Sequence, residues 1–406
     1  MAFNSLIAVR PSPSRSTTVA TSSTATITAP VAATEPKKRS RFYRPELDAL
    51  RFFAFFWVYC FHFVEYPASF FVAHGVPAFI AYPLTNLVGA GVFGVDLFFT
   101  LSSYLITELL LREKEEFGRV NVRDFYIRRI LRIWPLYFAF LAVAMIPAVN
   151  VDHVLTWKYL ACFLLLMGNW STILFGWPGR SVTGPLWTIS IEEQFYLAWP
   201  PVVARLSRRG IFYTACGMLA TSTLFRVVLV FIHGNKYSIW RNTFTRLDPI
   251  AAGIILAVLL HGQTLRLKWF SRLSLWLGGL FIVVCVFPWR IYDPASLEML
   301  PNLLGFPLLA LGCSLLLLSV LGVQSKIPAP LIYLGKISYG LYVLHDFGVF
   351  LTDKLLPVSH GTVHALLRIG LSLPITITLA AFSYHFLESP FLRLKGRFTR
   401  VASRPV

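Results

Sequence analysis

The sequence has few charged residues and few cysteines for its length. Only 14% of its 406 residues are charged, against about 25% in soluble globular domains, and 56% are hydrophobic. This composition excludes a soluble globular protein and predicts one that is embedded in a lipid bilayer. The cysteines lie in or beside apolar segments without a CxxC pair, so we expect small core residues and no disulfide framework: Cys60, Cys162, Cys216, Cys285 and Cys313.

Acidic residues are scarce as well: the sequence has 19 Asp and Glu residues and 37 Lys and Arg residues, which gives a net charge of +18. Such an excess would suit a nucleic-acid-binding protein. However, the sequence lacks an RNA-stacking motif and zinc-finger spacing, and its basic residues occupy short loops between apolar runs. We therefore exclude nucleic acid and expect these charges to set membrane topology or to bind anionic groups.

The sequence also lacks the short alternating segments of a membrane β-barrel. Apolar runs of about 20 residues recur instead, which is the length that an α-helix needs to cross a bilayer. The fold class is therefore all-α: a polytopic membrane protein with about ten transmembrane helices and one re-entrant or interfacial helix. The predicted spans are 47–66, 88–111, 132–149, 187–204, 211–232, 247–262, 273–290, 301–321, 333–355 and 365–387, and the additional helix is 154–171.

Three parts of the chain differ in composition. Residues 1–43 are rich in Ser, Thr, Ala and Pro, which predicts a disordered tail, and they show no secretory signal. Residues 44–395 form the membrane domain, and residues 396–406 form a short basic cytosolic tail.

Basic clusters set the predicted topology: they occur at 37–44, 112–132, 205–209, 266–272 and 393–404. With ten crossings and an inside N-terminus, all of them lie in the cytosol, so we expect a plasma or inner membrane protein with both termini cytosolic. A crossing by 154–171 would move every later cluster outside. Lys236, Arg241 and Arg246 remain on the outer side in this arrangement.

The first span carries an arginine and a histidine in RFFAFFWVYCFH, from Arg51 to His62. Eleven residues make three helical turns plus about 20°, so both side chains lie on one stripe about 16 Å apart. Ionisable residues in membrane helices usually face a protein or water-lined interior and are functional candidates. The alternative is a snorkelling arginine and a histidine that only packs.

Three carboxylates lie at a comparable depth. Asp96 follows Gly91 and Gly94 in the second span, where it is a catalytic candidate or an interhelical hydrogen-bonding group. Glu192 and Glu193 are adjacent in the fourth span and point about 100° apart, so at most one can face a given partner. A histidine with a carboxylate is the usual general base and its orienting group, which makes these residues candidate partners of His62.

An arginine cluster begins the third span. Arg128, Arg129 and Arg132 lie among aromatic residues that include Tyr126, a combination suited to a phosphate and a ring. Arginine binds phosphate bidentately, unlike lysine. Ordinary topology-setting charge is the alternative interpretation of this cluster.

Two later residues are candidates for binding an acceptor, Trp187 and His345, although helix packing explains His345 equally well. Glu388 and Arg393 are expected to form a structural ion pair.

Several of these segments resemble conserved blocks of the acyltransferase 3 family of membrane acyltransferases. They are ELDALRFFAFFWVYCFHF, GVDLFFTLSSYLIT, FYIRRILRIWPLYF, PLWTISIEEQFYLAWP, YGLYVLHDF and FLESPFLR, which occur in the family's order across residues 44 to 395. Ser103 stands where the family usually has glycine, and Asp346 where it often has an aromatic residue.

The resemblance implies transfer of an acyl group, commonly acetyl, from acyl-CoA to a hydroxyl of a saccharide or another small acceptor. His62 would be the catalytic histidine, Arg51 its partner in the motif, and Arg129 and Arg132 would hold the CoA phosphates. We expect acyl-CoA as co-substrate, with no metal or permanently bound cofactor, and a stand-alone membrane form without a hydrolase-like domain.

Two other functions are compatible with buried ionisable residues in a membrane bundle. One is a transporter, in which such residues form proton relays, and the other is a catalytically inactive family member that binds glycans. Acyl transfer by the purified protein distinguishes both from an enzyme.

Overall fold

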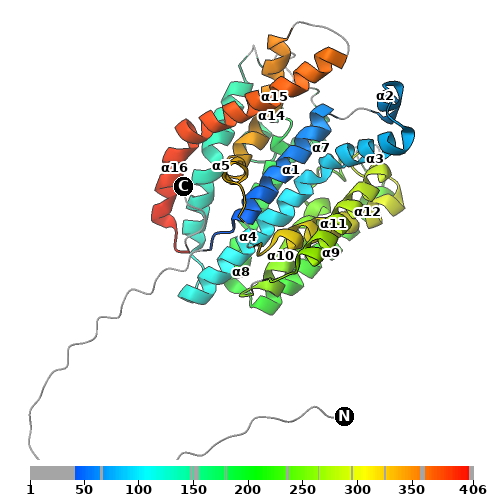
Figure 1. Cartoon of the computed structure of the whole chain (residues 1–406). Coiled ribbons are helices and arrows are strands. Elements are labelled where there is room, and N and C mark those ends of the chain that lie inside the picture. The colour runs from blue at the N-terminus through cyan, green and yellow to red at the C-terminus, as the bar shows by residue number, and fades with distance from the viewer. Residues whose placement is uncertain are drawn as a thin grey trace, which may run out of the picture. The chain divides into compact units, whose positions relative to one another are not determined.

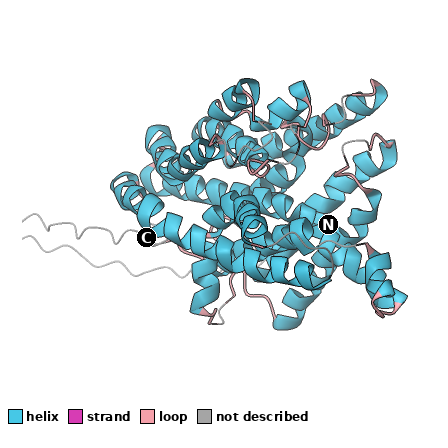
Figure 2. Ribbon diagram, turned by 90° about the horizontal axis from the view of Figure 1, so that it is seen from above, coloured by secondary structure: helices cyan, strands magenta, loops and turns pink. Residues whose placement is uncertain are grey.

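The computed structural model describes residues 42–64, 67–146, 149, 155–177, 179, 181–234, 237–263, 265–293, 296–323, 326–356 and 362–401. Throughout these residues the regular structure is helical, without a strand (Figures 1 and 2). The described helices all belong to the unit that begins at Arg39. Most of the predicted N-terminal tail and the last residues of the predicted C-terminal tail lie outside the described residues.

The helices follow one another along the chain with short connections. Their bounds are α1 (Pro45–Val64), α2 (Ala68–Ala73), α3 (Ala78–Gly89), η1 (Ala90–Phe93), α4 (Gly94–Phe117), α5 (Val122–Ala144), α6 (Trp157–Leu164), α7 (Gly168–Phe175), α8 (Leu186–Arg205), α9 (Arg208–Phe231), η2 (Phe244–Arg246), α10 (Leu247–Leu260), α11 (Trp269–Val286), η3 (Phe287–Trp289), α12 (Met299–Val320), α13 (Ala329–Lys336), α14 (Ser338–Leu355), α15 (Thr362–Phe382), η4 (Ser383–Glu388), α16 (Ser389–Lys395) and η5 (Gly396–Phe398).

Six helical segments among the described residues are long and apolar enough to cross a membrane. They are Pro45–Val64, Ala78–Phe117, Arg208–Phe231, Trp269–Trp289, Met299–Val320 and Leu367–Phe398. The predicted count of about ten is therefore not confirmed, although α5, α8, α10 and α14 coincide with the other four predicted spans. In place of the predicted 154–171 helix the structure has two short ones of eight residues each, α6 and α7, and α7 ends at Phe175, beyond the predicted bound. Each is about 12 Å long, too short to cross a bilayer alone.

Glycines allow α1, α4 and α10 to approach closely, as the sequence predicts for Gly91 and Gly94. A Cβ atom on Gly91 would lie 2.0 Å from the carbonyl oxygen of Trp57, and one on Gly94 would lie 2.7 Å from that of Ala54. On the other side of α4, a Cβ atom on Gly253 would lie 2.0 Å from Oγ of Ser103. The α4–α10 contact thus places a glycine opposite Ser103.

Described residues of the basic clusters contact neighbouring helix ends, and we call the end of the bundle where Lys114 and Arg272 lie the basic end. Lys114, at the end of α4, donates to the carbonyl of Val203 at 2.9 Å, near the end of α8. Arg272, at the start of α11, donates to the carbonyl of Leu321 at 2.9 Å, just after α12. These contacts gather the loops that the topology prediction assigns to a single membrane side.

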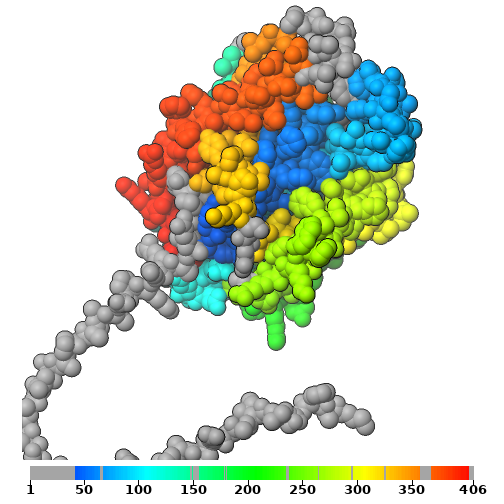
Figure 3. All heavy atoms as spheres, in the orientation of Figure 1, coloured from blue at the N-terminus to red at the C-terminus, as the bar shows by residue number. Residues whose placement is uncertain are grey.

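Apolar side chains cover the outside of the bundle. Part of α1 (blue) reaches the surface in Figure 3, between the C-terminal helices and the yellow-green α11 and α12. Phe56 of α1 is 39% exposed and Phe281 of α11 is 69% exposed. Such a surface suits lipid and supports an integral membrane protein.

The expected ion pair between Glu388 and Arg393 does not form. Glu388 is buried and accepts a hydrogen bond from Ser383 at 3.3 Å, whereas Arg393 is exposed. Glu388 ends η4 and Arg393 lies in α16; residues five apart in a continuous helix point about 140° away from each other, so the two side chains leave in different directions.

Candidate functional site

Arg51 and His62 of α1 line two neighbouring cavities, with Arg51 nearer the basic end and His62 nearer the opposite end. Asp48 holds the Arg51 side chain: Nη1 of Arg51 donates to Oδ1 of Asp48 at 2.9 Å, and the Tyr43 hydroxyl donates to Oδ2 at 3.0 Å. One helix therefore presents a fixed arginine to the first cavity and a histidine to the second.

Three cavities follow one another from the basic end to His62. The arginine cavity has a volume of about 40 Å³, the middle cavity about 90 Å³ and the large cavity about 560 Å³. Arg129 and Arg132 line both the arginine and the middle cavity. Val95 and Tyr342 line both the middle and the large cavity. The three cavities are therefore neighbours that share walls.

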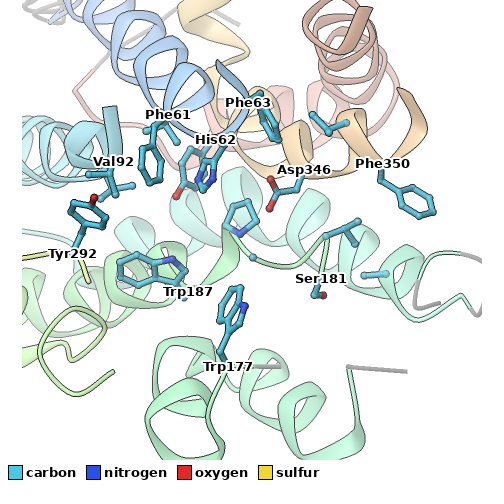
Figure 4. Close-up of a pocket in the computed structure, with 18 of the residues that line it drawn as sticks. Phe61, His62, Phe63, Val92, Trp177, Ser181, Trp187, Tyr292, Asp346 and Phe350 are labelled. Atoms are coloured by element: carbon cyan, nitrogen blue, oxygen red, sulfur yellow. The ribbon is translucent and has the colours of Figure 1, made fainter. Parts of the chain in front are cut away.

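The large cavity combines ionisable and aromatic side chains. In Figure 4, His62 and Asp346 enter it from one wall, and Trp177 and Trp187 enter it from the opposite wall. His62 is exposed to this cavity, and its imidazole has no hydrogen-bond partner among the described residues. Both ring nitrogens are therefore available to a small molecule in the cavity.

His345 lies behind His62 and does not line the large cavity. The centroids of the two rings are 5.3 Å apart. His345 is fully buried, and its Nδ1 donates to the carbonyl of Tyr342 at 2.6 Å. Its Nε2 lies 3.6 Å from Oδ1 of Asp346 and makes no hydrogen bond. In this position His345 can hold the ring of His62 but does not reach the cavity itself.

The two glutamates of α8 have different surroundings, as their predicted angular separation requires. Glu192 lines the middle cavity with Arg51 and accepts hydrogen bonds from Ser102 at 3.1 Å and Tyr196 at 2.9 Å. Glu193 lines none of the three cavities and accepts from Nε1 of Trp134 at 3.1 Å. Neither glutamate lines the cavity that contains His62.

The arginines of the α5 cluster differ in their contacts: one makes side-chain hydrogen bonds with other described residues, and two do not. Arg128 donates to the carbonyl of Phe398 at 2.7 Å and to Glu113 at 3.2 Å. The guanidinium of Arg129 lies between the rings of Phe125 and Tyr196, at 5.3 and 5.0 Å from their centroids. In the described part of the chain, neither Arg129 nor Arg132 donates a side-chain hydrogen bond. Their donors remain available to an anion.

Two further residues define the surroundings of this cluster. Tyr126 lines none of the cavities, and its hydroxyl donates to the carbonyl of Leu197 at 2.7 Å, so it joins α5 to α8. Lys395, at the end of α16, lines the arginine cavity. Sequence reasoning counted Lys395 only as topology-setting charge, because nothing in its spacing links it to α5.

Asp96 is fully buried away from the three cavities. Its Oδ1 lies 2.7 Å from Nη2 of Arg246, and both side chains are 0% exposed. A second buried pair, between Asp248 and Arg226, lies on α10 and α9 with 2.5 Å between the charged atoms. These pairs connect α4, α9 and α10, and they give Arg246 a partner inside the bundle instead of a place in an outer loop.

Arg241 is a further site residue that sequence reasoning missed. It precedes η2 and lines the large cavity together with Trp187. Burial lowers the pKa of Arg241 to about 10, so its guanidinium remains charged at neutral pH. The topology prediction places Arg241 on the outer side of the membrane, where positive charges are uncommon. This is the one signal in the sequence that could have identified it as a site residue.

Comparison with known proteins gives the chain a family. Residues 44–385 match the acyltransferase domain that defines the acyltransferase 3 family. The chain is 28% identical to the "Putative peptidoglycan O-acetyltransferase YrhL" of Bacillus subtilis, over 80% of this chain and 54% of that protein. It is 26% identical to the peptidoglycan O-acetyltransferase OatA of Listeria monocytogenes, over 86% of this chain and 56% of that protein.

The chain spans about half the length of these curated relatives. No solved structure matches it. The family match extends over residues 44–385. This range includes α1 with Arg51 and His62, the arginine cluster of α5 and the glutamates of α8. The protein therefore belongs to the acyltransferase 3 family of membrane acyltransferases.

Proposed function

We propose that this protein transfers an acyl group, commonly acetyl, from acyl-CoA to a hydroxyl of a saccharide or cell-surface polysaccharide. The observation that carries the proposal is the series of neighbouring cavities from Arg129 and Arg132 to His62. Membership of an acyltransferase family and the relatives named peptidoglycan O-acetyltransferases support it.

The donor would enter at the basic end. Arg129, Arg132 and Lys395 would bind the CoA phosphates, since all three line the arginine cavity. Arginine side chains bind phosphate through two parallel hydrogen bonds. From there the pantetheine arm, about 15–20 Å long when extended, would follow the middle cavity. That length matches the rise of about 16 Å between Arg51 and His62 on α1.

The acceptor would occupy the large cavity from the opposite end, with Trp187 in its wall. His62 would act as general base: it removes the proton from the acceptor hydroxyl while that oxygen attacks the thioester carbonyl. The new C–O bond forms, the C–S bond breaks, and the proton passes from His62 to the departing CoA thiolate. Holding both substrates in neighbouring cavities would supply much of the rate through proximity and exclusion of water.

The other residues named from the sequence would support this reaction from different distances. Glu192 and Arg51 would position the pantetheine arm in the middle cavity, and His345 would hold the ring of His62. Asp96, Glu193 and Tyr126, which line none of the cavities, would stabilise the bundle.

The full topology belongs to the same proposal. With α5, α8, α10 and α14 also crossing, the chain would cross ten times, and the basic end and both termini would lie in the cytosol, where acyl-CoA is made. The segment with α6 and α7 would then stay on the outer side. Labelling of single cysteines introduced at Gly118 and Arg208 should report the cytosol, and one at Gly179 the outside.

The function is tested with the purified protein in detergent. We expect release of CoA from acetyl-CoA and, with a saccharide present, mass-spectrometric detection of an O-acetylated product. His62→Ala should lower turnover by at least 10²–10⁴-fold. Phe56→Ala is the matched control, because Phe56 lies on the same helix but at the outer surface.

Wild-type turnover by His62→Ala would refute the mechanism. A wild-type protein that releases no CoA but carries saccharide into proteoliposomes would be a transporter instead.

A further inference from the structure

Arg241, which is half-buried, differs from the buried arginines Arg226 and Arg246 because its charge has no partner. Arg226 and Arg246 each form an ion pair with an aspartate. Nε and Nη1 of Arg241 are shielded from solvent and make no hydrogen bond, and no carboxylate among the described residues lies within ion-pair distance of its guanidinium. A buried cation without a counter-charge is costly, so a structure that keeps one usually has a use for it.

Aromatic rings fix the orientation of this guanidinium. Its central carbon lies 4.1 Å from the ring centroid of Trp177, 5.1 Å from that of Trp187 and 5.6 Å from that of Tyr237. Rings that contact a guanidinium hold it through cation–π attraction and do not use its N–H donors. Arg241 is therefore pre-oriented, and its Nη2, which is not among the shielded atoms and makes no hydrogen bond in the described part of the chain, remains available.

The available donors lie at the cavity that contains His62. Arg241 and His62 both line the large cavity, which at about 560 Å³ has room for a sugar unit. The two acidic residues of this cavity do not pair with Arg241: Asp353 pairs with Arg368 at 2.5 Å, and Asp346 lies 3.6 Å from Nε2 of His345, with neither carboxylate within ion-pair distance of Arg241. The charge of Arg241 is thus left for a ligand.

We propose that Arg241 binds an anionic oxygen group of the acceptor, a carboxylate or a phosphate ester, and so selects acidic saccharides. This inference rests on the proposed function, because it names the acceptor class of the same cavity. The aromatic wall would contact the apolar face of the sugar ring while the anionic group accepts hydrogen bonds from Arg241. The arginine would thereby fix which hydroxyl of the acceptor faces His62.

The test measures binding of small saccharide probes to the purified full chain by calorimetry. Methyl glucuronide supplies a carboxylate, glucose 6-phosphate a phosphate ester, and methyl glucoside is the neutral counterpart. We expect at least one anionic probe to bind about ten- to a hundredfold more tightly than methyl glucoside, the effect of a charge-assisted bond. The stronger of the two anionic probes identifies the group.

Two variants assign the preference to the arginine. Arg241→Gln should remove it, and Arg241→Lys should retain only part of it, because lysine keeps the charge but not the fork of donors. Arg290→Gln is the control, since Arg290 is an arginine with a 68% exposed side chain that pairs with Asp293 and does not line the cavity. Thermal melting of each variant shows whether it is folded.

Equal affinities of the three probes for the wild-type protein would overturn this inference, as would a preference that survives in Arg241→Gln. Turnover of acetyl-CoA by the same preparation separates this outcome from a failure of the proposed function. Turnover of acetyl-CoA without an anion preference would refute only the proposal of an acidic acceptor. An anion preference without turnover would refute only the proposal of acyl transfer.

Discussion

Val95 of α4 and Tyr342 of α14 together form the junction between the middle cavity and the large cavity. Val95 is 6% exposed and Tyr342 8% exposed, and the Tyr342 hydroxyl is hydrogen-bonded to Oγ1 of Thr188 on α8 at 2.8 Å. Three helices that are far apart in the sequence therefore form the shared wall that a thioester would have to pass to reach His62 in the proposed reaction.

Closing this junction should separate donor binding from transfer. Val95→Trp places a large side chain at the junction, so we expect turnover of acetyl-CoA to fall by about 10²-fold or more, because the reacting groups can no longer meet. Binding of CoA itself, measured by calorimetry, should persist, since the arginine cavity is unchanged. Val95→Ile is the matched control and should keep most of the turnover. Unchanged turnover in a folded Val95→Trp protein would mean that the thioester does not pass this junction.

Arg132→Lys tests the donor site. Lysine keeps the positive charge, so topology should persist, but it loses the bidentate fork that suits a phosphate. We expect the apparent affinity for CoA to fall by about 1.5–3 kcal/mol, or about ten- to a hundredfold, with a smaller change in turnover at saturating donor. The half-saturating concentration of acetyl-CoA is the measurement. If it stays at the wild-type value, Arg132 serves topology alone.

Asp96→Asn tests whether Asp96 is structural. The substitution leaves the buried Arg246 without its counter-charge, which costs about 3–5 kcal/mol. We expect a clearly lower melting temperature in detergent. The combined variant Asp96→Leu with Arg246→Met, which removes both charges, should recover much of the loss.

A different result would support the catalytic role that the sequence suggested for Asp96. In that case Asp96→Asn would have the melting temperature of the wild type but would lose turnover of acetyl-CoA.

Helix periodicity explains which features could be predicted from the sequence. Apolar runs overlap every long helix, although α5 begins at Val122 and its predicted span at 132, and the spacing of Arg51 and His62 placed both on one side of α1. Gly91 and Gly94 correctly indicated close helix contact, because a missing side chain has a purely local consequence.

Helix periodicity could not predict which side chains from distant helices contact one another. Depth in the membrane suggested that a glutamate of α8 faces His62, but depth carries no information on rotation about the helix axis. Glu192 lines the neighbouring cavity instead, and Asp346 lines that of His62. Arg241 and Lys395 join the cavities through chain folding alone, and no spacing in the sequence relates either residue to α1.

His261 joins α10 to α4 at the basic end in a manner that depends on pH. Its Nδ1 lies 2.8 Å from a carboxylate oxygen of Glu108, and its Nε2 lies 3.0 Å from one of Glu115. Only the protonated imidazole can donate from both nitrogens at once. The hydrogen bond with Glu108 raises the pKa of His261, partly opposed by burial, and Glu115 adds to the rise. Arg112, which donates to Glu108 at 2.6 Å, is the other charge in the cluster.

This geometry predicts that the stability of the bundle falls as pH rises. A raised pKa means that the folded protein binds the proton more tightly than the unfolded chain, whose histidines titrate near 6.5. The stabilisation by His261 is therefore fully present below about pH 6.5 and is lost as pH rises through the higher pKa of the folded state. We expect the melting temperature in detergent to fall over this range more steeply for the wild type than for His261→Gln. His233→Asn, in which an exposed histidine is replaced, should follow the wild type. Parallel pH profiles for the wild type and His261→Gln would show that the two carboxylates do not hold a protonated histidine at this contact.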